Sequence, residues 1–378
     1  MKFRNILCAI IAMAAAISCT EKAEDNNFTI KRGTNLSHWL SQSFDRGEIR
    51  ERKVTEEDIV RLKEYGFDHV RIPVDEEQFW NEQGEKEQEA WNILTNVLDW
   101  CVAHDVRAIV DLHIIRSHNF NASNSGGHNT LFESEDEQDR LVGFWRQFSE
   151  VLKDYPNKYV AYEFMNEPVA DNPEDWNAII AKVHKALREL EPNRTLVIGS
   201  NMWQSVSTFG DLKVPDGDQH ILLSCHFYEP MLLTHYRASW NEFIRYSGPV
   251  HYPGVMVTEE EFEALTAEEQ AIVRRFTTVW DKDRLKEMIR PAAEYAKAHG
   301  LPLYCGEWGV YDPAPREDAY NWYRDVISIF DEFDMAWSTW CYFSGFGFWD
   351  WQKQEINDQP MLDILLSGKS LQDSGCSE

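Results

Sequence analysis

The segment Tyr159-Val160-Ala161-Tyr162-Glu163-Phe164 has the apolar, β-branched and aromatic character of a short buried strand. The tetrapeptide Met165-Asn166-Glu167-Pro168 follows it directly and places a carboxylate at the end of the strand. An amphipathic helix is then expected over 173–191, where Pro173 suits the first helical position. A strand, a polar strand end and a long helix form the repeating unit of parallel α/β proteins.

The same unit recurs along the chain. Seven further strands are predicted at 29–35, 69–72, 107–112, 195–198, 221–226, 303–305 and 335–340. Helical patterns lie between them at 55–65, 87–104, 134–155, 281–299 and 316–333, whereas the connection around 209–218 is too short and too interrupted by Gly and Pro. Eight strands alternating with helices over residues 29–378 predict one (β/α)8 TIM-barrel domain rather than an open, doubly wound sheet.

Two connections of the predicted barrel are unusually long. Residues 117–133 follow the third strand, and residues 227–280 follow the sixth strand and contain a helical stretch that starts at Thr258. Both lie at the carboxyl ends of strands, which is the face where barrel enzymes carry their active sites. These extended loops are therefore expected to shape the cleft.

The charge of the chain excludes one class of partner. Lys and Arg number 37 and Asp and Glu number 64, which gives a formal net charge of −27. Such an acidic protein repels phosphate backbones, so nucleic-acid binding is not expected. A neutral polysaccharide remains a suitable partner, although most of the aromatic residues, 13% of the chain, are expected in the core.

The N-terminus has the features of a targeting segment. Lys2 and Arg4 precede an apolar run over 6–17, which is too short to span a bilayer and predicts a signal peptide over 1–18. Ala16-Ile17-Ser18-Cys19 resembles a bacterial lipobox, in which Cys19 becomes the lipidated first residue; ordinary cleavage beside an incidental cysteine is the alternative. Residues 19–28 then form an acidic tether, which favours a cell-surface lipoprotein of the outer membrane, with the periplasmic face or secretion as alternatives.

The remaining cysteines have no metal-ligand spacing. Five of them lie in the predicted domain: Cys101, Cys225, Cys305, Cys341 and Cys376. An odd number without a regular pattern favours buried free thiols over a disulfide framework. Three of these cysteines recur near predicted strand ends, which leaves open one close pair among Cys225, Cys305 and Cys341.

Two glutamates occupy corresponding positions at the ends of the fourth and seventh strands. Glu167 follows the fourth strand, and Glu307 stands in Gly306-Glu307-Trp308-Gly309 after the seventh. Two carboxylates facing each other across a barrel mouth suit glycoside hydrolysis, in which one protonates the leaving oxygen and the other attacks the sugar or activates water. Further polar or aromatic groups stand at other strand ends: Arg71, His113, Asn166, His226, Tyr228 and Trp340.

The ordered set of motifs resembles glycoside hydrolase family 5, whose retaining members carry both glutamates on strands four and seven. The similar stretches are Val70-Arg71-Ile72-Pro73, Asp111-Leu112-His113, Asn166-Glu167-Pro168, His226-Phe227-Tyr228, Gly306-Glu307-Trp308 and Trp340, and the likeness covers residues 29 to about 367. The resemblance implies that Glu167 is the acid/base and Glu307 the nucleophile. It also implies substrate-binding roles: Asn166 on the 2-hydroxyl, Arg71 and Tyr228 on the nucleophile, His113 and His226 around the cleaved sugar, and Trp340 stacked beneath it.

The chain departs from the family pattern at the borders of the site. Ile114 replaces a second histidine found in many members, Cys341 follows the last tryptophan, and His38 with Trp39 occupies the first loop. These departures leave the choice among β-1,4-glucan, mixed-linkage glucan, xyloglucan and mannan open.

The expected function is a retaining, endo-acting β-glycosidase of the cellulase type, with an endo-β-1,4-glucanase-like activity on polysaccharide or oligosaccharide. It should be a monomer that needs no cofactor and no metal. Exo action, mannanase or xyloglucanase activity and transglycosylation stay as alternatives within the family. Two further alternatives come from different classes of protein: a non-catalytic glycan-binding lipoprotein, and a metal-dependent lyase or isomerase. The second is disfavoured because no strand end in the sequence offers a cluster of metal ligands.

Overall fold

In the computed structural model, which describes residues 27–122 and 127–371, eight parallel strands close into a barrel. The strands are β1 (Arg32–Asn35), β2 (His69–Asp75), β3 (Arg107–Ile114), β4 (Val160–Glu163), β5 (Leu196–Gly199), β6 (Ile221–Phe227), β9 (Leu303–Trp308) and β10 (Ala336–Thr339). Their order round the barrel is β1-β10-β9-β6-β5-β4-β3-β2, and every neighbouring pair is parallel. The predicted (β/α)8 barrel is confirmed.

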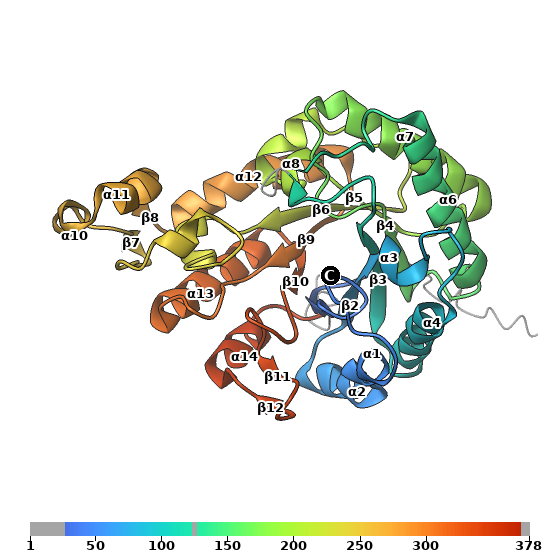
Figure 1. Cartoon of the computed structure of the whole chain (residues 1–378), viewed down its shortest axis with the longest axis horizontal. Helices are drawn as coiled ribbons and strands as arrows, with labels where there is room; N and C mark the ends of the chain where they lie inside the picture. Colours follow the sequence, from blue (N-terminus) through green and yellow to red (C-terminus); the bar gives the residue numbers. More distant parts are fainter. Residues whose placement is uncertain (1–26, 123–126, 372–378) are drawn as a thin grey trace, which may run out of the picture.

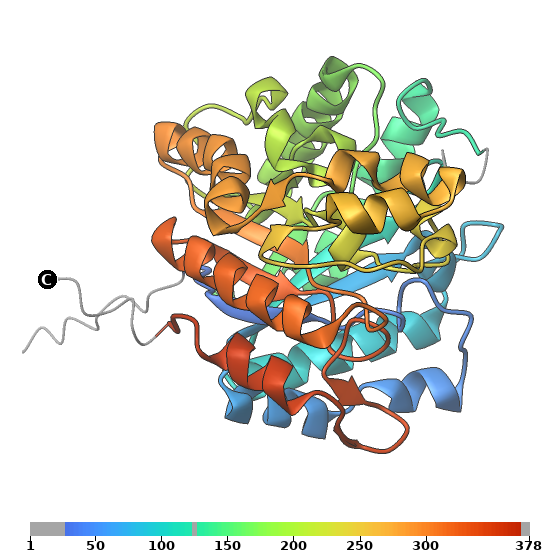
Figure 2. The same ribbon diagram turned by 90° about the vertical axis from the view of Figure 1, so that its left-hand side faces the viewer.

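Long helices surround the strands, as Figures 1 and 2 show from two sides. They are α2 (Glu56–Tyr65), α4 (Gln88–Ala103), α6 (Glu135–Leu152), α7 (Pro173–Leu190), α12 (Lys282–His299) and α13 (Arg316–Glu332). Their ends follow the sequence signals: the Ser134 side chain accepts a hydrogen bond from the backbone N–H of Glu137, and Gly66 and Gly300 end their helices in the left-handed conformation. As expected, the connection after β5 holds only the short α8 (Asn201–Gln204) and a 3₁₀-helix over Val206–Asp211.

The barrel interior has two layers because successive side chains of a strand alternate between its two faces. The lower layer is apolar and receives one side chain from each of β3, β4, β5, β6, β9 and β10, together with Ile30 from just before β1: Ile30, Ile109, Ala161, Val197, Leu222, Tyr304 and Ala336. Two residues further along β3 and β4, on the same face as Ile109 and Ala161, stand Asp111 and Glu163, which are fully buried. A polar layer therefore lies directly above an apolar plug, at the carboxyl ends of the strands.

The connection between β6 and α12 forms a separate projection, seen on one side of the barrel in Figure 1. Its elements are α9 (Met231–Thr234), a 3₁₀-helix (Glu242–Arg245), β7 (Gly254–Val255), α10 (Glu259–Ala264), α11 (Ala267–Val273), a 3₁₀-helix (Arg274–Phe276) and β8 (Val279–Trp280). The helix expected after Thr258 is α10, and the Thr258 side chain caps it.

Several elements are not foreseen in the sequence. They are the β7–β8 ribbon, α1 (Glu48–Lys53), α3 (Glu76–Phe79), a second ribbon of β11 (Trp349–Asp350) and β12 (Glu355–Ile356), and the final helix α14 (Gln359–Leu366). Strand bounds also shift: β1 begins later than expected, β10 spans only four residues, and β9 continues through Trp308. Glu307 therefore lies within its strand rather than after it.

Candidate active site

Strand register brings the polar strand ends together in pairs. Asn35 of β1 lies opposite Arg71 of β2, and Asp111 of β3 lies opposite Glu163 of β4. Between β6 and β9 the register shifts after Cys225, so that His226 pairs with Glu307. This irregularity places an imidazole beside a carboxylate on adjacent strands.

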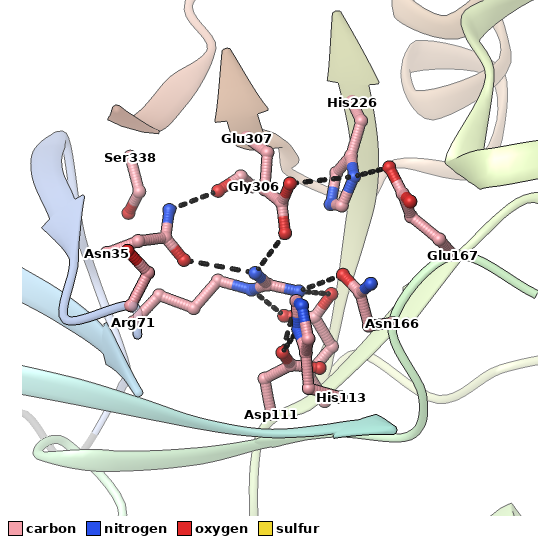
Figure 3. Close-up of polar contacts among 12 residues, drawn as sticks. Asn35, Arg71, Asp111, His113, Asn166, Glu167, His226, Gly306, Glu307 and Ser338 are labelled. Carbon is pink, nitrogen blue, oxygen red and sulfur yellow. Dashed lines mark hydrogen bonds and ion pairs between the residues drawn. The ribbon is translucent and has the colours of Figure 1, made fainter. Parts of the chain in front are cut away.

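Arg71 lies at the centre of the polar layer, where its guanidinium is surrounded by acceptors (Figure 3). It is fully buried and contacts six side-chain oxygens: Asn35 Oδ1 at 3.0 Å, Asp111 Oδ2 at 3.0 Å, Glu163 Oε2 at 2.6 Å and Oε1 at 3.1 Å, Asn166 Oδ1 at 2.9 Å and Glu307 Oε1 at 2.7 Å. Burial by itself would lower the pKa of Arg71, but the three carboxylates raise it well above its ordinary value. A permanent cation therefore lies beneath the mouth of the barrel.

Glu307 receives two hydrogen bonds from the protein. Arg71 Nη1 donates to Oε1 at 2.7 Å, and the Tyr228 hydroxyl donates to Oε2 at 3.2 Å. Glu307 is only 5% exposed, and burial raises its pKa while the charge of Arg71 opposes that rise. Both donors favour the ionised carboxylate.

Glu167 has a different environment. It is 8% exposed and adopts a left-handed backbone conformation with φ of 45°, which is unusual for a residue other than glycine. Its Oε1 and Nδ1 of His226 share a hydrogen bond of 2.8 Å. Burial, and secondarily the charge of Glu307, raise the pKa of Glu167 well above its ordinary value, while burial lowers that of His226. The group best suited to carry a proton is therefore Glu167.

The two carboxylates lie close together across the site. One oxygen of Glu167, one oxygen of Glu307 and a ring nitrogen of His226 all lie within 4.8 Å of one another. The spacing of these three groups would allow them to hold a metal ion, so the expectation that no cluster of metal ligands would form is wrong. That expectation considered each strand end by itself, whereas the three groups come from three different strand ends. The guanidinium of Arg71 lies 2.7 Å from Glu307 Oε1 and would repel a cation at this site.

His113 and Trp340 form one wall of the site. Their rings are stacked, with centroids 5.5 Å apart and planes 4° from parallel, and Trp340 is 7% exposed. Both ring nitrogens of His113 are already engaged: Nδ1 lies 2.7 Å from Asp111 Oδ2, and Nε2 lies 2.9 Å from Nε2 of Gln42. All eight predicted catalytic and substrate-binding residues thus converge on one face of the barrel. His113, however, offers no free nitrogen to a sugar.

Some residues of this face are missed by the sequence analysis. Asn35, Asp111 and Glu163 belong to the Arg71 network, and the two acids could have been found from their alternation with Ile109 and Ala161.

Trp203 lies beside this face and is not singled out in the sequence either; it reaches the site through Phe120, whose ring centroid lies 5.4 Å from that of His113. Trp203 is 37% exposed on a turn after β5 in which Met202, Trp203 and Gln204 all have positive φ, and its indole N–H donates to the backbone oxygen of Phe120 at 3.0 Å. Gln204 packs against Gly199, where an added Cβ would approach within 2.1 Å, so glycine is needed for this turn to close.

The expectation of buried free thiols is met for Cys101, Cys225, Cys305 and Cys341, and Cys225 pairs in register with Cys305. Cys19, Cys376, the signal segment 1–18 and most of the tether lie outside the described residues. Within 27–122 and 127–371, no helix combines the length and the apolar composition required to cross a bilayer.

Comparison with known proteins agrees with this geometry. The family model described as cellulase (glycosyl hydrolase family 5) matches residues 24–345. Endoglucanase C of Acetivibrio thermocellus is 32% identical over 83% of this chain and 91% of its own length, and cellodextrinase A of Ruminococcus flavefaciens is 27% identical over 81% and 84%.

Solved structures of Thermotoga maritima Cel5A, in complex with cellobiose and with mannotriose, give TM-scores of 0.72 and 0.71. Each is 22% identical and covers 90% of this chain and 98% of the other. At this identity the likeness shows a shared barrel fold.

Proposed function

The chain belongs to glycosyl hydrolase family 5 and is an O-glycosyl hydrolase, and we propose that it cleaves β-linked polysaccharide of the β-1,4-glucan type with retention of configuration. The observation that carries the proposal is the spacing of Glu167 and Glu307, whose nearest oxygens lie within 4.8 Å. Retaining glycosidases place their two carboxyl groups about 5–5.5 Å apart, whereas inverting enzymes need about 6.5–9.5 Å to admit a water molecule. The shorter spacing favours direct attack by a carboxylate.

In the first step, Glu307 attacks the anomeric carbon while Glu167 gives its proton to the leaving oxygen. The hydrogen bonds from Arg71 and Tyr228 keep Glu307 ionised for this attack. The buried Asn166 Nδ2 has no hydrogen-bond partner among the described residues, which suits donation to the 2-hydroxyl of the sugar. The products of this step are a glycosyl ester on Glu307 and a released alcohol.

In the second step, water displaces Glu307 from the sugar. Glycosylation removes the negative charge of Glu307, one of the causes that raise the pKa of Glu167. The pKa of Glu167 therefore falls, and the same carboxylate accepts the proton of the incoming water. Two displacements at one carbon restore the original β configuration.

The glucan specificity and the endo action draw their support from the relatives. The most similar of those described above is an endoglucanase, and the second is named a cellodextrinase. Mannan is the second candidate substrate, because the Thermotoga maritima barrel has been solved with mannotriose. The endoglucanase favours internal cleavage of a glucan chain.

A panel of β-glucan, xyloglucan and mannan, with product profiling and early proton NMR, tests this function. We expect internal cleavage of β-1,4-glucan with the β-anomer of the new reducing end appearing first. Immediate formation of the α-anomer would contradict retention, and preferential cleavage of mannan would replace the substrate.

We also propose that Cys19 anchors the enzyme to the outer membrane by a lipid, with the acidic segment 19–28 as a tether to the cell surface. The support is the lipobox-like sequence Ala16-Ile17-Ser18-Cys19. In Cys19→Ala the protein should move from the membrane to the soluble fraction. Activity on intact cells that added protease cannot remove would contradict exposure at the surface.

A further inference from the structure

Gln42 lies in the loop after β1 and is tied to the site from two directions. Its backbone N–H donates to Asp75 Oδ2 at 2.7 Å, and the N–H of Asp75, at the end of β2, donates to Leu40 O at 2.9 Å. These two bonds clamp the loop, and Gln42 itself is held in a left-handed conformation with φ of 50°. The amide of Gln42 then reaches His113, where the two Nε2 atoms lie 2.9 Å apart.

The proton positions in this contact follow from the partners of His113. Burial lowers the pKa of His113 to about 3, so the ring is neutral and carries one N–H. Burial raises the pKa of Asp111 to about 7, but the charge of Arg71, which lies 3.0 Å from Oδ2, opposes that rise and favours the ionised carboxylate. An ionised carboxylate can only accept, so in the contact of 2.7 Å with Asp111 Oδ2 the ring proton of His113 lies on Nδ1. Nε2 then carries a lone pair and must receive its hydrogen bond from the Gln42 amide.

This assignment fixes the orientation of the Gln42 side chain. An amide that donates one N–H to His113 has a second N–H and a carbonyl oxygen left to use. The residue is exposed to solvent, whereas His113 is buried with both nitrogens engaged. Of these two contacting side chains, the one that offers a polar group to a ligand is therefore Gln42 rather than His113.

The strand order places Gln42 relative to the bond that is cleaved. Round the barrel, β2 and β3 separate β1 from β4 on one side, and β10, β9, β6 and β5 separate them on the other. The loop after β1 thus lies across the mouth from Glu167, which follows β4. Because Glu167 faces the leaving group, Gln42 lies on the side of the sugar that becomes attached to Glu307.

We propose that Gln42 is a substrate-contact residue on the glycone side, which binds a sugar hydroxyl through its amide and fixes the tautomer of His113. A continuous chain of contacts joins it to the nucleophile: Gln42 to His113 at 2.9 Å, His113 to Asp111 at 2.7 Å, Asp111 to Arg71 at 3.0 Å and Arg71 to Glu307 at 2.7 Å. This chain of contacts positions a substrate bound by Gln42 relative to Glu307, the carboxylate that attacks it. The inference rests on the proposed function, since only a glycosidase has a glycone side.

Two substitutions separate contact from mere packing. Gln42→Met keeps the length of the side chain but removes its hydrogen bonds, and should lower kcat/KM for an aryl β-cellobioside about threefold to tenfold, mainly through KM, as expected for one neutral hydrogen bond. Gln88→Met is the matched control, because Gln88 is an exposed glutamine on the outer helix α4, bonded to Asn92.

Gln42→Glu gives a readout that packing alone would not move. The new carboxylate faces the lone pair of His113 Nε2 and repels it. Uptake of a proton between the two groups relieves this repulsion, so the pKa of His113 should rise. The ratio of kcat/KM for Gln42→Glu to that of the wild type should therefore increase as the pH falls from about 8 to about 5. The charged or titratable groups that also act on His113 are the same in both proteins: His38, Arg71, Asp111, Glu163, His226 and Glu307. Asp75, which accepts from the backbone N–H of Gln42 and whose pKa burial raises to about 7, is also common to both and cancels in the ratio.

The wild-type assay distinguishes the two claims. A wild type that hydrolyses no aryl β-cellobioside or β-glucan contradicts the proposed function itself. An active wild type with Gln42→Met within twofold of it overturns the glycone contact. A pH-independent ratio for Gln42→Glu overturns the contact with His113. Loss of activity in Gln42→Met but not in Gln88→Met, together with the pH-dependent ratio, supports the inference.

Discussion

Glu307 and Glu167 are the same side chain at two strand ends, yet the two regions around them differ. Glu307 accepts hydrogen bonds from a cation and a phenol, Arg71 and Tyr228. Glu167 shares a single hydrogen bond with a neutral imidazole, His226, and sits on a backbone with positive φ. Both are nearly buried, so burial alone does not distinguish them.

The difference lies in what opposes burial. Removal from water raises the pKa of both carboxyl groups, but only at Glu307 does a guanidinium in direct contact offset this rise. The pair should therefore lose its first proton from Glu307, which leaves one ionised nucleophile beside one protonated acid. Four predictions test this division, from the largest effect to the smallest.

The largest effect is expected from Glu307→Ala. Without the attacking carboxylate no glycosyl ester can form, so kcat should fall more than about 10⁴-fold on activated and natural substrates alike. Steady-state assays on a dinitrophenyl β-cellobioside and on β-glucan measure this. Equal residual activity in Glu307→Ala and Glu167→Ala on the activated substrate would remove the distinction between the two regions.

Glu167→Ala should have an effect that depends on the leaving group. Natural glucan needs proton donation, so its hydrolysis should fall about 10²–10⁴-fold, whereas dinitrophenolate can leave unassisted. The glycosyl-enzyme should then accumulate, and a rapid burst of dinitrophenol should precede slow turnover. A uniform loss on both substrates would contradict the assignment of Glu167 as the acid.

Tyr228→Phe should sharpen the comparison through pH. Its hydroxyl stabilises the ionised form of Glu307, so its removal should raise the pKa of Glu307 and move the acidic limb of the bell-shaped kcat/KM profile to higher pH. The loss at the optimum should be about tenfold, as for one hydrogen bond to a charged group. A shift of the alkaline limb alone would place Tyr228 on the Glu167 side instead.

The smallest effect is a change in the titration midpoint of Glu167 in Glu307→Gln. Burial is the main cause of its raised pKa and the charge of Glu307 the second, so the midpoint should fall but stay above the ordinary value of about 4.3. Carboxyl-carbon NMR on this inactive variant measures it. An unchanged or higher midpoint would mean that burial alone sets the pKa of Glu167. The proposed fall of this pKa on glycosylation of Glu307 would then be wrong.

The barrel and both glutamates are predictable from the sequence because each strand is a local apolar run that ends in a polar group. Glu163 and Asp111 carried a readable signal, since they alternate with the apolar residues Ala161 and Ile109. The register shift that places His226 beside Glu307 is a long-range feature with no local signal.

Gln42 and Trp203 could not be placed in advance for another reason. Both stand on loops where residues other than glycine adopt positive φ, and only the surrounding packing imposes that conformation. Likewise, the contact between Gln42 and His113 joins residues 71 positions apart. Local patterns therefore predict the scaffold and its carboxylates, whereas the loops that border the substrate depend on tertiary contacts.

Covalent trapping tests the central claim, that Glu307 is the nucleophile of a retaining hydrolase, most directly. A 2-deoxy-2-fluoro-β-cellobioside with a dinitrophenyl leaving group forms the glycosyl-enzyme but releases it slowly, so mass spectrometry of the intact and digested protein can locate the sugar. We predict one added fluorocellobiosyl group per chain, attached to Glu307. A label on Glu167 or on another side chain would contradict the account. So would loss of activity in the presence of the reagent without any sugar attached to the protein.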